Sequence, residues 1–390
     1  MQSEYGALSY QGIPPASGAW REGFPQGERL FYDFGPFTTD TGFVFDRIRV
    51  AYQTWGVLND DASNAIYIAH ALTGDSHVTG DAGQGHITGG WWNSLVGPGA
   101  PIDTDKYYVV CANVLGGCQG TTGPSSAAPD SKPWGSRFPV VTIADMVRVE
   151  YELMKYLGIS SYSLVLGPSL GGMRVLEWML RYPDAVRGGL VLGSTAAVSA
   201  EEIGIHATQI IAIELDPHFD NGDYYESAVG PVAGMGLARR IAHLSYRSER
   251  ELDLRFGRNL QGTDLPSEGG VFAVESYLDH HADKLARRFD ANTYIALTRA
   301  MTLFDLGEGR GGVAKALSMI TAPLTVVGID SDRLFPLRLQ QEIVDCAPGA
   351  DQLHLLISPI GHDGFLVEED QVARFVGHAL SRIEETTTAQ

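Results

Sequence analysis

Basic residues are scarce in this chain. Lysine and arginine total 28 against 47 aspartates and glutamates, which gives a formal net charge of -19 over 390 residues. Nucleic acids and anionic membrane surfaces bind clustered lysine and arginine, so this balance argues against either as a partner. The chain also has no run of about 18 apolar residues, so we expect no membrane-spanning helix.

Cysteine is scarcer still. The chain holds only Cys111, Cys118 and Cys346, with no C-x-x-C pair among them. This count argues against a disulfide framework and against a cysteine-based zinc site. The first residues show neither the basic region nor the apolar region of a secretory signal. Together these absences predict a cytoplasmic protein in a reducing compartment.

Apolar residues are plentiful, at 44% of the chain, which is enough for a large core. Extended apolar runs alternate with helical patterns along most of the sequence, as is typical of a mostly parallel sheet covered on both faces. The expected strands span 47–55, 65–72, 107–114, 162–166, 189–192, 324–328 and 353–357. The expected helices lie near 143–157, 170–181, 336–346 and 365–383.

The alternation stops between residues 199 and 305, where helical patterns replace strands. We therefore predict a sheet domain in two parts, 29–198 and 306–383, interrupted by a helical lid at 199–305. A loose N-terminal arm rich in Gly, Pro and Ser (1–28) and a disordered Thr-rich tail (384–390) complete this division.

The segment Gly167-Pro-Ser169-Leu-Gly171 stands between a strand pattern and a helix pattern. A serine between two glycines at such a junction is typical of a nucleophile elbow. The tight turn requires small flanking residues and holds the serine in a strained conformation. It also leaves the N–H of the next residue, Leu170, free to bind an oxyanion.

A serine nucleophile needs a histidine base and a carboxylate that orients the histidine. Asp332 and His362 each follow a predicted strand, at the carboxyl edge where open sheets of this type gather ligands. The chain order Ser, Asp, His also suits the elbow. We predict Ser169, Asp332 and His362 as a catalytic triad. Asp330 is the alternative acid, although it comes early after the strand.

A second N–H donor for the oxyanion is expected where an early strand ends in the segment His70–Gly74. We assign this donor to Leu72. The alternative interpretation makes His70 and His77 a metal-binding pair. No third ligand stands at a suitable spacing, so we predict no metal site.

Nine short segments form a more specific pattern than the elbow alone. They are His70-Ala-Leu-Thr-Gly-Asp-Ser-His77, Gly89-Gly-Trp-Trp92, Gly97-Pro-Gly-Ala-Pro-Ile-Asp103, Asn113-Val-Leu-Gly-Gly-Cys118, Thr122-Gly-Pro-Ser-Ser126, Gly135-Ser-Arg-Phe-Pro139, Gly167-Pro-Ser-Leu-Gly-Gly-Met173, Ser331-Asp-Arg-Leu-Phe-Pro336 and Gly361-His-Asp-Gly-Phe365. Together they resemble the homoserine O-acetyltransferase family of α/β-hydrolase enzymes. Pro168 departs from the glycine usual in the family, which an extended backbone would accommodate.

The resemblance implies an α/β-hydrolase fold with a helical lid. It implies transfer of acetyl from acetyl-CoA to the hydroxyl of L-homoserine through an acyl-serine, an early step of methionine biosynthesis. Acetyl-CoA would be a co-substrate, with no permanently bound cofactor. The resemblance further implies a homodimer formed through the helical insertion.

The acceptor-binding residues of the family fall on Arg239, Tyr246 and Asp363. Arg239 and Tyr246 are seven apart and would share one helix face. The Arg239 guanidinium would clamp the homoserine carboxylate in a two-pronged contact, and Asp363 would take the ammonium. Arg240 is an equal candidate from the sequence alone. We expect His281 on the lid surface.

Other functions of the same fold stay open at this point. They are succinyl-CoA as donor, L-serine as acceptor, and an esterase in which water replaces the amino acid. A non-catalytic binding protein is a further alternative, against which the intact triad argues. Fold and triad are shared by the transferases and the esterase, so only the acceptor pocket discriminates between them.

Overall fold

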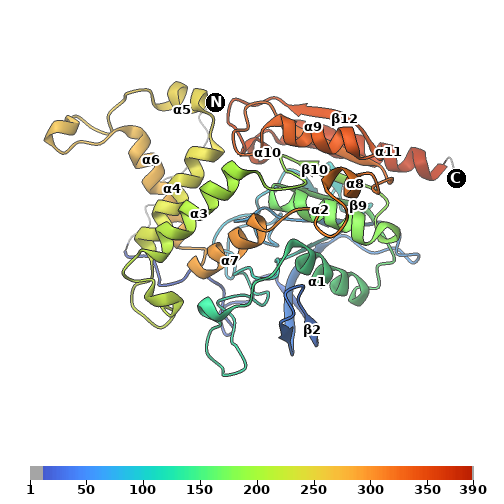
Figure 1. The fold of residues 1–390 in the computed structure, drawn as a ribbon, viewed down its shortest axis with the longest axis horizontal. Coiled ribbons are helices and arrows are strands. Elements are labelled where there is room, and N and C mark those ends of the chain that lie inside the picture. The colour runs from blue at the N-terminus through green and yellow to red at the C-terminus, as the bar shows by residue number, and fades with distance from the viewer. Residues whose placement is uncertain (1–11, 389–390) are drawn as a thin grey trace.

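The computed structural model describes residues 12–388 (Figure 1). Its centre is an eight-stranded sheet with the strand order β1-β4-β8-β5-β9-β10-β11-β12. These strands are β1 (Leu30–Phe34), β4 (Ile48–Trp55), β5 (Ala65–Ile68), β8 (Tyr108–Ala112), β9 (Tyr162–Pro168), β10 (Gly189–Leu192), β11 (Leu324–Ile329) and β12 (Ala350–Leu356). Strand β4 runs antiparallel to β1 and β8, and all other neighbours are parallel. The predicted mostly parallel sheet is confirmed.

Helices cover both faces of the sheet because the buried strands are apolar on both sides. Along β9, Val165 belongs to one hydrophobic cluster, whereas Leu164 and Leu166 belong to a second. The first cluster includes side chains of α1 (Ile143–Tyr156), α2 (Leu170–Arg181), α8 (Val313–Leu317) and α9 (Leu337–Cys346). The second includes side chains of α11 (Glu369–Thr388). Successive side chains of β9 therefore point into two different cores.

Between β10 and β11 the described residues form helices and add no strand to the sheet. The main helices of this stretch are α3 (Ala200–Glu214), α4 (Val232–Tyr246), α5 (Glu249–Phe256), α6 (Ala273–Ala286) and α7 (Ala291–Thr302). Figure 1 shows them to one side of the sheet. The two ends of the stretch meet, since the Val198 N–H donates to the Phe304 carbonyl over 3.1 Å. We call residues 199–305 the helical insertion.

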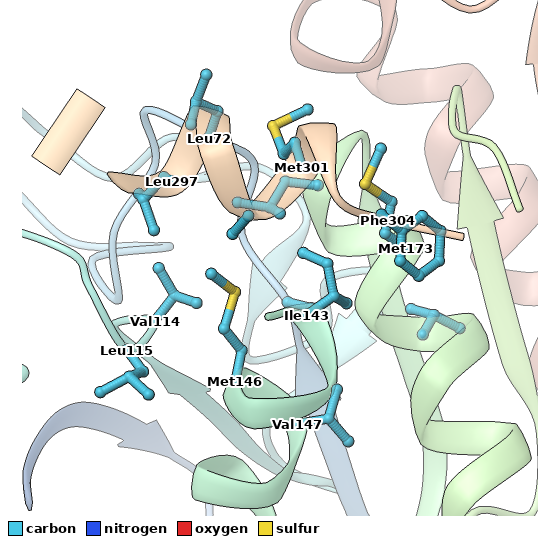
Figure 2. Packing of buried hydrophobic residues seen from close by; sticks show 14 of the residues in the cluster. Leu72, Val114, Leu115, Ile143, Met146, Val147, Met173, Leu297, Met301 and Phe304 are labelled. Atoms are coloured by element: carbon cyan, nitrogen blue, oxygen red, sulfur yellow. The ribbon is translucent and has the colours of Figure 1, made fainter. Parts of the chain in front are cut away.

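Helix α7 packs the helical insertion onto the core. Leu297 and Met301 of α7 lie in one cluster with Met146 of α1 and Met173 of α2 (Figure 2). Leu72, from the loop after β5, belongs to the same cluster. Burial of each such side chain contributes roughly 1.5–3 kcal/mol relative to exposure. The base of the insertion and the loop that carries Leu72 therefore share one packed core.

The predicted loose N-terminal arm, residues 1–28, is fixed over part of its length. Its first eleven residues lie outside those that the structure describes. Farther along, the Gly18 N–H donates to the Phe289 carbonyl over 3.0 Å, and the Trp20 N–H donates to the Cys118 carbonyl over 2.9 Å. The prediction of a loose arm is wrong at these residues because their backbone groups bond to the core and to the helical insertion.

The predicted disordered tail, residues 384–390, is wrong as far as Thr388, where α11 ends. The last two residues lie outside the described part of the chain. A buried stripe of Val372, Val376 and Ile383 holds this helix against the sheet, and the glutamates that follow are good helix formers. No helix among residues 12–388 is long and apolar enough to cross a membrane.

Candidate active site

Ser169 stands at the turn between β9 and α2 with φ 55° and ψ -122°. A positive φ is strained for a residue with a side chain, and this strain is typical of a nucleophile elbow. The turn tolerates no extra atoms, since a Cβ on Gly171 would lie 2.0 Å from the Ala69 carbonyl oxygen and one on Gly167 2.6 Å from it. Pro168 ends β9 in an extended conformation, so the expectation that proline fits here is confirmed.

A buried ion pair ties α2 to the loop after β5. Arg174 Nη1 lies 2.5 Å from Glu150 Oε1, and the same guanidinium donates to the His70 carbonyl. The Trp178 indole N–H donates to the other Glu150 oxygen over 2.7 Å. Both charged side chains are at most 2% exposed, so removal of either would leave the other buried without an opposite charge, at a cost of about 3–5 kcal/mol. The network therefore fixes the Leu72 loop relative to the elbow.

The two predicted oxyanion donors are available. Neither the Leu72 N–H nor the Leu170 N–H has a hydrogen-bond partner among the described residues. Leu170 is the first residue of α2, where helical N–H groups lack an intrahelical acceptor. Backbone donors in such positions suit a developing negative charge on oxygen.

The alternative of a metal pair at His70 and His77 does not fit the structure. His70 Nδ1 lies 2.8 Å from the Ala71 carbonyl oxygen, and Nε2 accepts the Val114 N–H over 3.1 Å. Burial lowers the pKa of His70 to about 3, so its ring is neutral and serves the backbone. His77 Nε2 lies 3.2 Å from the Asp81 carbonyl oxygen. Both rings are used as structural hydrogen-bonding groups.

Asp332 orients His362 as the sequence predicts. His362 Nδ1 lies 2.7 Å from Asp332 Oδ2, while Asp332 Oδ1 accepts the N–H groups of Leu334 and Phe335. Burial lowers the pKa of His362, but the charge and hydrogen bond of Asp332 outweigh it, and the pKa lies above its usual value. Asp330 instead accepts the Ser358 N–H over 2.9 Å, so the alternative acid is occupied elsewhere.

The end of α4 holds the loop that carries His362. The His362 N–H donates to the Tyr246 carbonyl over 2.7 Å, and the Ser248 N–H donates to the Ile360 carbonyl over 3.0 Å. Gly361, between them, has φ +94°, and a Cβ there would lie 2.4 Å from the Tyr246 oxygen. The helical insertion therefore positions the backbone of the predicted base.

One cavity of about 460 Å³ collects most of the predicted site residues. Its lining includes Leu72, Ser169, Arg239, Tyr246, His362 and Asp363. Asp332 does not line it and lies behind the His362 ring. Leu170 is fully buried at the start of α2. The structure thus brings the predicted nucleophile, base and acceptor-binding residues to a single space.

Arg239 and Arg240 have different surroundings, although they are neighbours on α4. Two guanidinium nitrogens of Arg239, Nε and Nη1, are buried without a hydrogen-bond partner among the described residues. Its guanidinium lies 5.7 Å from the centre of the Tyr246 ring. Arg240 donates to Asp279 at the surface and is 36% exposed. Arg239 therefore lines the cavity, whereas Arg240, the alternative from the sequence, does not.

Asp363 shares its charge with a residue that the sequence did not single out. Arg247 Nε lies 3.5 Å from Asp363 Oδ2, and both side chains line the cavity. Arg247 directly follows α4, one residue beyond Tyr246. Arg247 contacts Asp363 only because the end of α4 packs against the loop that carries His362. No local sequence pattern predicts that contact.

Two histidines in the cavity were also missed or misplaced. His243 lies four residues after Arg239 on α4, a spacing that could have revealed it. His281, expected on the lid surface, lines the cavity instead, with its ring 4.1 Å from that of His243. Burial and the nearby Arg239 lower the pKa of His281 to about 3 and lower that of His243 as well. Both rings are therefore neutral, and the positive charge of the cavity lining comes from its arginines and Lys284.

The fold and this site define the class of the protein. Residues 64–369 match the family model of the alpha/beta hydrolase fold. The solved structure of homoserine O-acetyltransferase from Bacillus anthracis superposes with a TM-score of 0.82 at 28% identity, over 89% of this chain and 97% of that one. Esterase E22 also gives 0.82 at 28% identity, over 90% and 99%. The chain has an α/β-hydrolase fold, and shape alone does not separate a transferase from an esterase.

Sequence similarity makes that separation. A homoserine O-acetyltransferase of Thermobifida fusca is 55% identical over 379 residues, which are 96% of this chain and 100% of that protein. One from Mycobacterium leprae is 49% identical over 355 residues, 91% of this chain and 93% of its own. This chain belongs to the homoserine O-acetyltransferase family.

Proposed function

We propose that this protein transfers the acetyl group of acetyl-CoA to the hydroxyl of L-homoserine through an acyl-Ser169 intermediate, a step of methionine biosynthesis. The observation that carries the proposal is that two guanidinium nitrogens of Arg239 are buried without a hydrogen-bond partner among the described residues, in the cavity that Ser169 and His362 line. A buried charge without a partner is costly, and the carboxylate of an amino acid would satisfy it. An esterase that uses water has no need of this group.

In the first half-reaction, His362 Nε2 takes the proton of the Ser169 hydroxyl as the oxygen attacks the thioester carbon. The negative charge moves to the carbonyl oxygen, where the Leu72 and Leu170 N–H groups would stabilise it. The carbon–sulfur bond then breaks, and the CoA thiol leaves with a proton from His362. Asp332 stabilises the imidazolium while it exists, because its carboxylate lies 2.7 Å from Nδ1.

In the second half-reaction, His362 takes the proton of the homoserine hydroxyl, whose oxygen attacks the acyl carbon. The bond to Ser169 breaks and the serine recovers a proton from His362, which yields O-acetylhomoserine. Arg239 would hold the acceptor carboxylate and Asp363 its ammonium, with Tyr246 against the guanidinium. This chemistry needs only acetyl-CoA as co-substrate and no permanently bound cofactor.

Water competes with the acceptor at about 55 M, so transfer depends on binding that orients the homoserine hydroxyl. We expect Arg239→Ala to leave acylation of Ser169 nearly intact and to weaken transfer by roughly 2–4 kcal/mol. The measurement is the ratio of O-acetylhomoserine to free acetate per CoA released. Arg240→Ala is the matched control and should keep the wild-type ratio. An unchanged ratio in Arg239→Ala would reject this acceptor site and leave hydrolysis as the better account.

We also propose a cytoplasmic homodimer. The support for a dimer is a set of exposed apolar side chains on two packed helices of the insertion. These are Ile203 and Ile211 of α3, Leu215 directly after α3, and Leu237 and Leu244 of α4. Their spacings of eight, four and seven residues place each set along one helix face. Such a patch is typical of a surface that another protein covers.

A further inference from the structure

Two histidines and an aspartate converge at the edge of the sheet, on β12 and α11. His354 Nε2 lies 3.2 Å from Asp351 Oδ2, and His378 Nε2 lies 2.7 Å from the same oxygen. The three donor atoms all lie within 4.8 Å of one another. These separations are close to those between ligands that share one metal ion, given bond lengths of about 2.0–2.2 Å to nitrogen and oxygen.

A β-bulge creates this convergence. Residues three apart on a regular strand point to opposite faces, so Asp351 and His354 would not meet. The pairing of β12 with β11 shifts here: Leu324 faces Ala350, whereas Val326 faces Leu353. One extra residue on β12 re-aims the Asp351 side chain to the side of His354, as bulges do next to functional sites. The sequence spacing alone did not indicate a metal site.

Helix α11 supplies the third donor and fixes the geometry. Arg382, four residues after His378, donates to the carbonyl groups of Leu324 and Gly349 at the start of the bulged region. Its Nη1 lies 3.4 Å from Asp351 Oδ1, while the shortest contact of each histidine is with Oδ2. The Phe375 ring lies 5.9 Å from that of His354. The positive charge of Arg382 repels a cation at this position, so only an ion that the three donors bind strongly would be held there.

We propose that Asp351, His354 and His378 bind a divalent transition-metal ion of the zinc type. Two imidazole nitrogens and one carboxylate oxygen suit zinc, copper or nickel, whereas magnesium and calcium prefer oxygen ligands alone. The ion replaces the two hydrogen bonds to Oδ2, with the ring protons on Nδ1. His378 is 39% exposed and Asp351 25%, so water completes the coordination. The bound ion clips the C-terminal helix α11 to the edge strand β12.

The test is calorimetric titration of the full-length, chelator-treated protein with Zn²⁺. We expect one site per chain and a higher Tm with Zn²⁺, because the ion binds the folded state. His378→Ala and Asp351→Asn should each weaken Zn²⁺ binding by at least roughly 10–100-fold. Loss of a residue that only supports a metal ligand already has an effect of this size, and these two residues would be ligands themselves. They should also abolish the Tm increase. Asp351→Asn keeps the size of the side chain, so it tests the site even if His378→Ala fails to fold.

His218→Ala is the matched control. His218 Nδ1 lies 3.4 Å from Asp216 Oδ1 at an exposed position, a histidine–aspartate pair outside the three-donor group. Its removal should leave Zn²⁺ affinity unchanged. Absence of saturable binding in the wild type would overturn the proposal, and so would equal affinity in wild type, Asp351→Asn and His378→Ala. Acetyl transfer uses none of these residues, so either result is independent of the proposed function.

Discussion

The histidines and the arginines that line the cavity differ in charge. Burial and the field of Arg239 keep His281 neutral, with a pKa of about 3, so the ring adds shape and hydrogen bonding without charge. Arg247 pairs with the charge of Asp363 over 3.5 Å, whereas Arg239 has two buried guanidinium nitrogens without a hydrogen-bond partner among residues 12–388 and no ion pair there. In the proposed function, the acceptor carboxylate would bind Arg239 of the helical insertion and the acceptor ammonium would bind Asp363 beside His362.

His362 sets the expected pH dependence. Asp332 raises the pKa of His362, so the neutral base forms only at pH values above the usual 6.5. Activity should therefore rise with pH through a midpoint above 6.5 and be lost as pH falls through it. Asp332→Asn removes the main cause of the raised pKa, so the midpoint should move to lower pH while kcat falls by about 10⁴-fold. The measurement is the pH profile of kcat/KM for acetyl-CoA.

Glu202 provides the control for that profile. Its carboxyl is fully buried at the start of α3, and burial raises its pKa to about 7, within the same range. Glu202→Gln should keep an acid limb, because the limb belongs to His362. If the limb disappears in Glu202→Gln and stays in place in Asp332→Asn, the assignment to His362 is wrong.

The sequence predicted which residue types form the site, but it did not fix the position of every one of them. Ser169, Asp332 and His362 follow strands in an order that the fold makes recognisable. Arg239 and Arg240 are adjacent on a helix, about 100° apart around its axis, and no local signal chooses between them. The choice depends on Asp279 of α6, which pairs with Arg240 at the surface.

At the scale of elements, the contact between α4 and the His362 loop joins segments more than 100 residues apart. Three features concentrate there: the bond from the His362 N–H to the Tyr246 carbonyl, the bond from Ser248 to Ile360, and the positive φ of Gly361. The helical insertion therefore holds the backbone of His362, the predicted base, in addition to lining the cavity.

Gly361→Ala tests this contact. The new Cβ would lie 2.4 Å from the Tyr246 oxygen at φ +94°, so we expect a loss of about 1–3 kcal/mol in the free energy of unfolding and a marked fall in kcat. Gly377→Ala is the control, since a Cβ there meets no atom within 4 Å and alanine favours the helix by roughly 0.5–1 kcal/mol. Thermal unfolding and steady-state kinetics measure both effects. Unchanged kcat in Gly361→Ala would show that the insertion does not position His362.

Element boundaries were predictable where one physical signal dominates. The apolar periodicity after the elbow predicted a helix over 170–181, and α2 has those bounds. Strand β1 was not predicted, because its half-exposed residues lack a clear alternation at the sheet edge. Strand β12 begins at Ala350, whereas the sequence predicted a start near residue 353. The prediction missed Asp351 and Gln352 because they are polar residues within the β-bulge and break the apolar pattern of the strand.

At the scale of the molecule, the apolar face of the insertion contrasts with the acidic remainder of the chain. The net charge of -19 keeps separate molecules apart, so association requires a local apolar surface. Ile211 of α3 is 53% exposed, and Leu215, which follows the last residue of α3, is 76% exposed. Helix α3 packs against α4. This surface is where we expect the second protomer.

Light scattering in solution should therefore give the mass of two chains. Ile211→Glu places a charge in the proposed interface and should shift the mass toward one chain, because an unpaired buried charge is costly. Met319→Glu is the control, since Met319 is 55% exposed but lies outside the helical insertion. A monomeric wild type, or a dimer that tolerates Ile211→Glu as well as Met319→Glu, would reject this interface.

In the mechanism that we propose, the acetyl group is bound to Ser169 before it reaches homoserine. Mass spectrometry of the protein mixed with acetyl-CoA alone should show a gain of about 42 Da on the peptide that contains Ser169. Added L-homoserine should remove this label and release O-acetylhomoserine, and Ser169→Ala should neither gain the label nor turn over. Formation of O-acetylhomoserine by Ser169→Ala, or a label on another residue that homoserine discharges, would contradict the account.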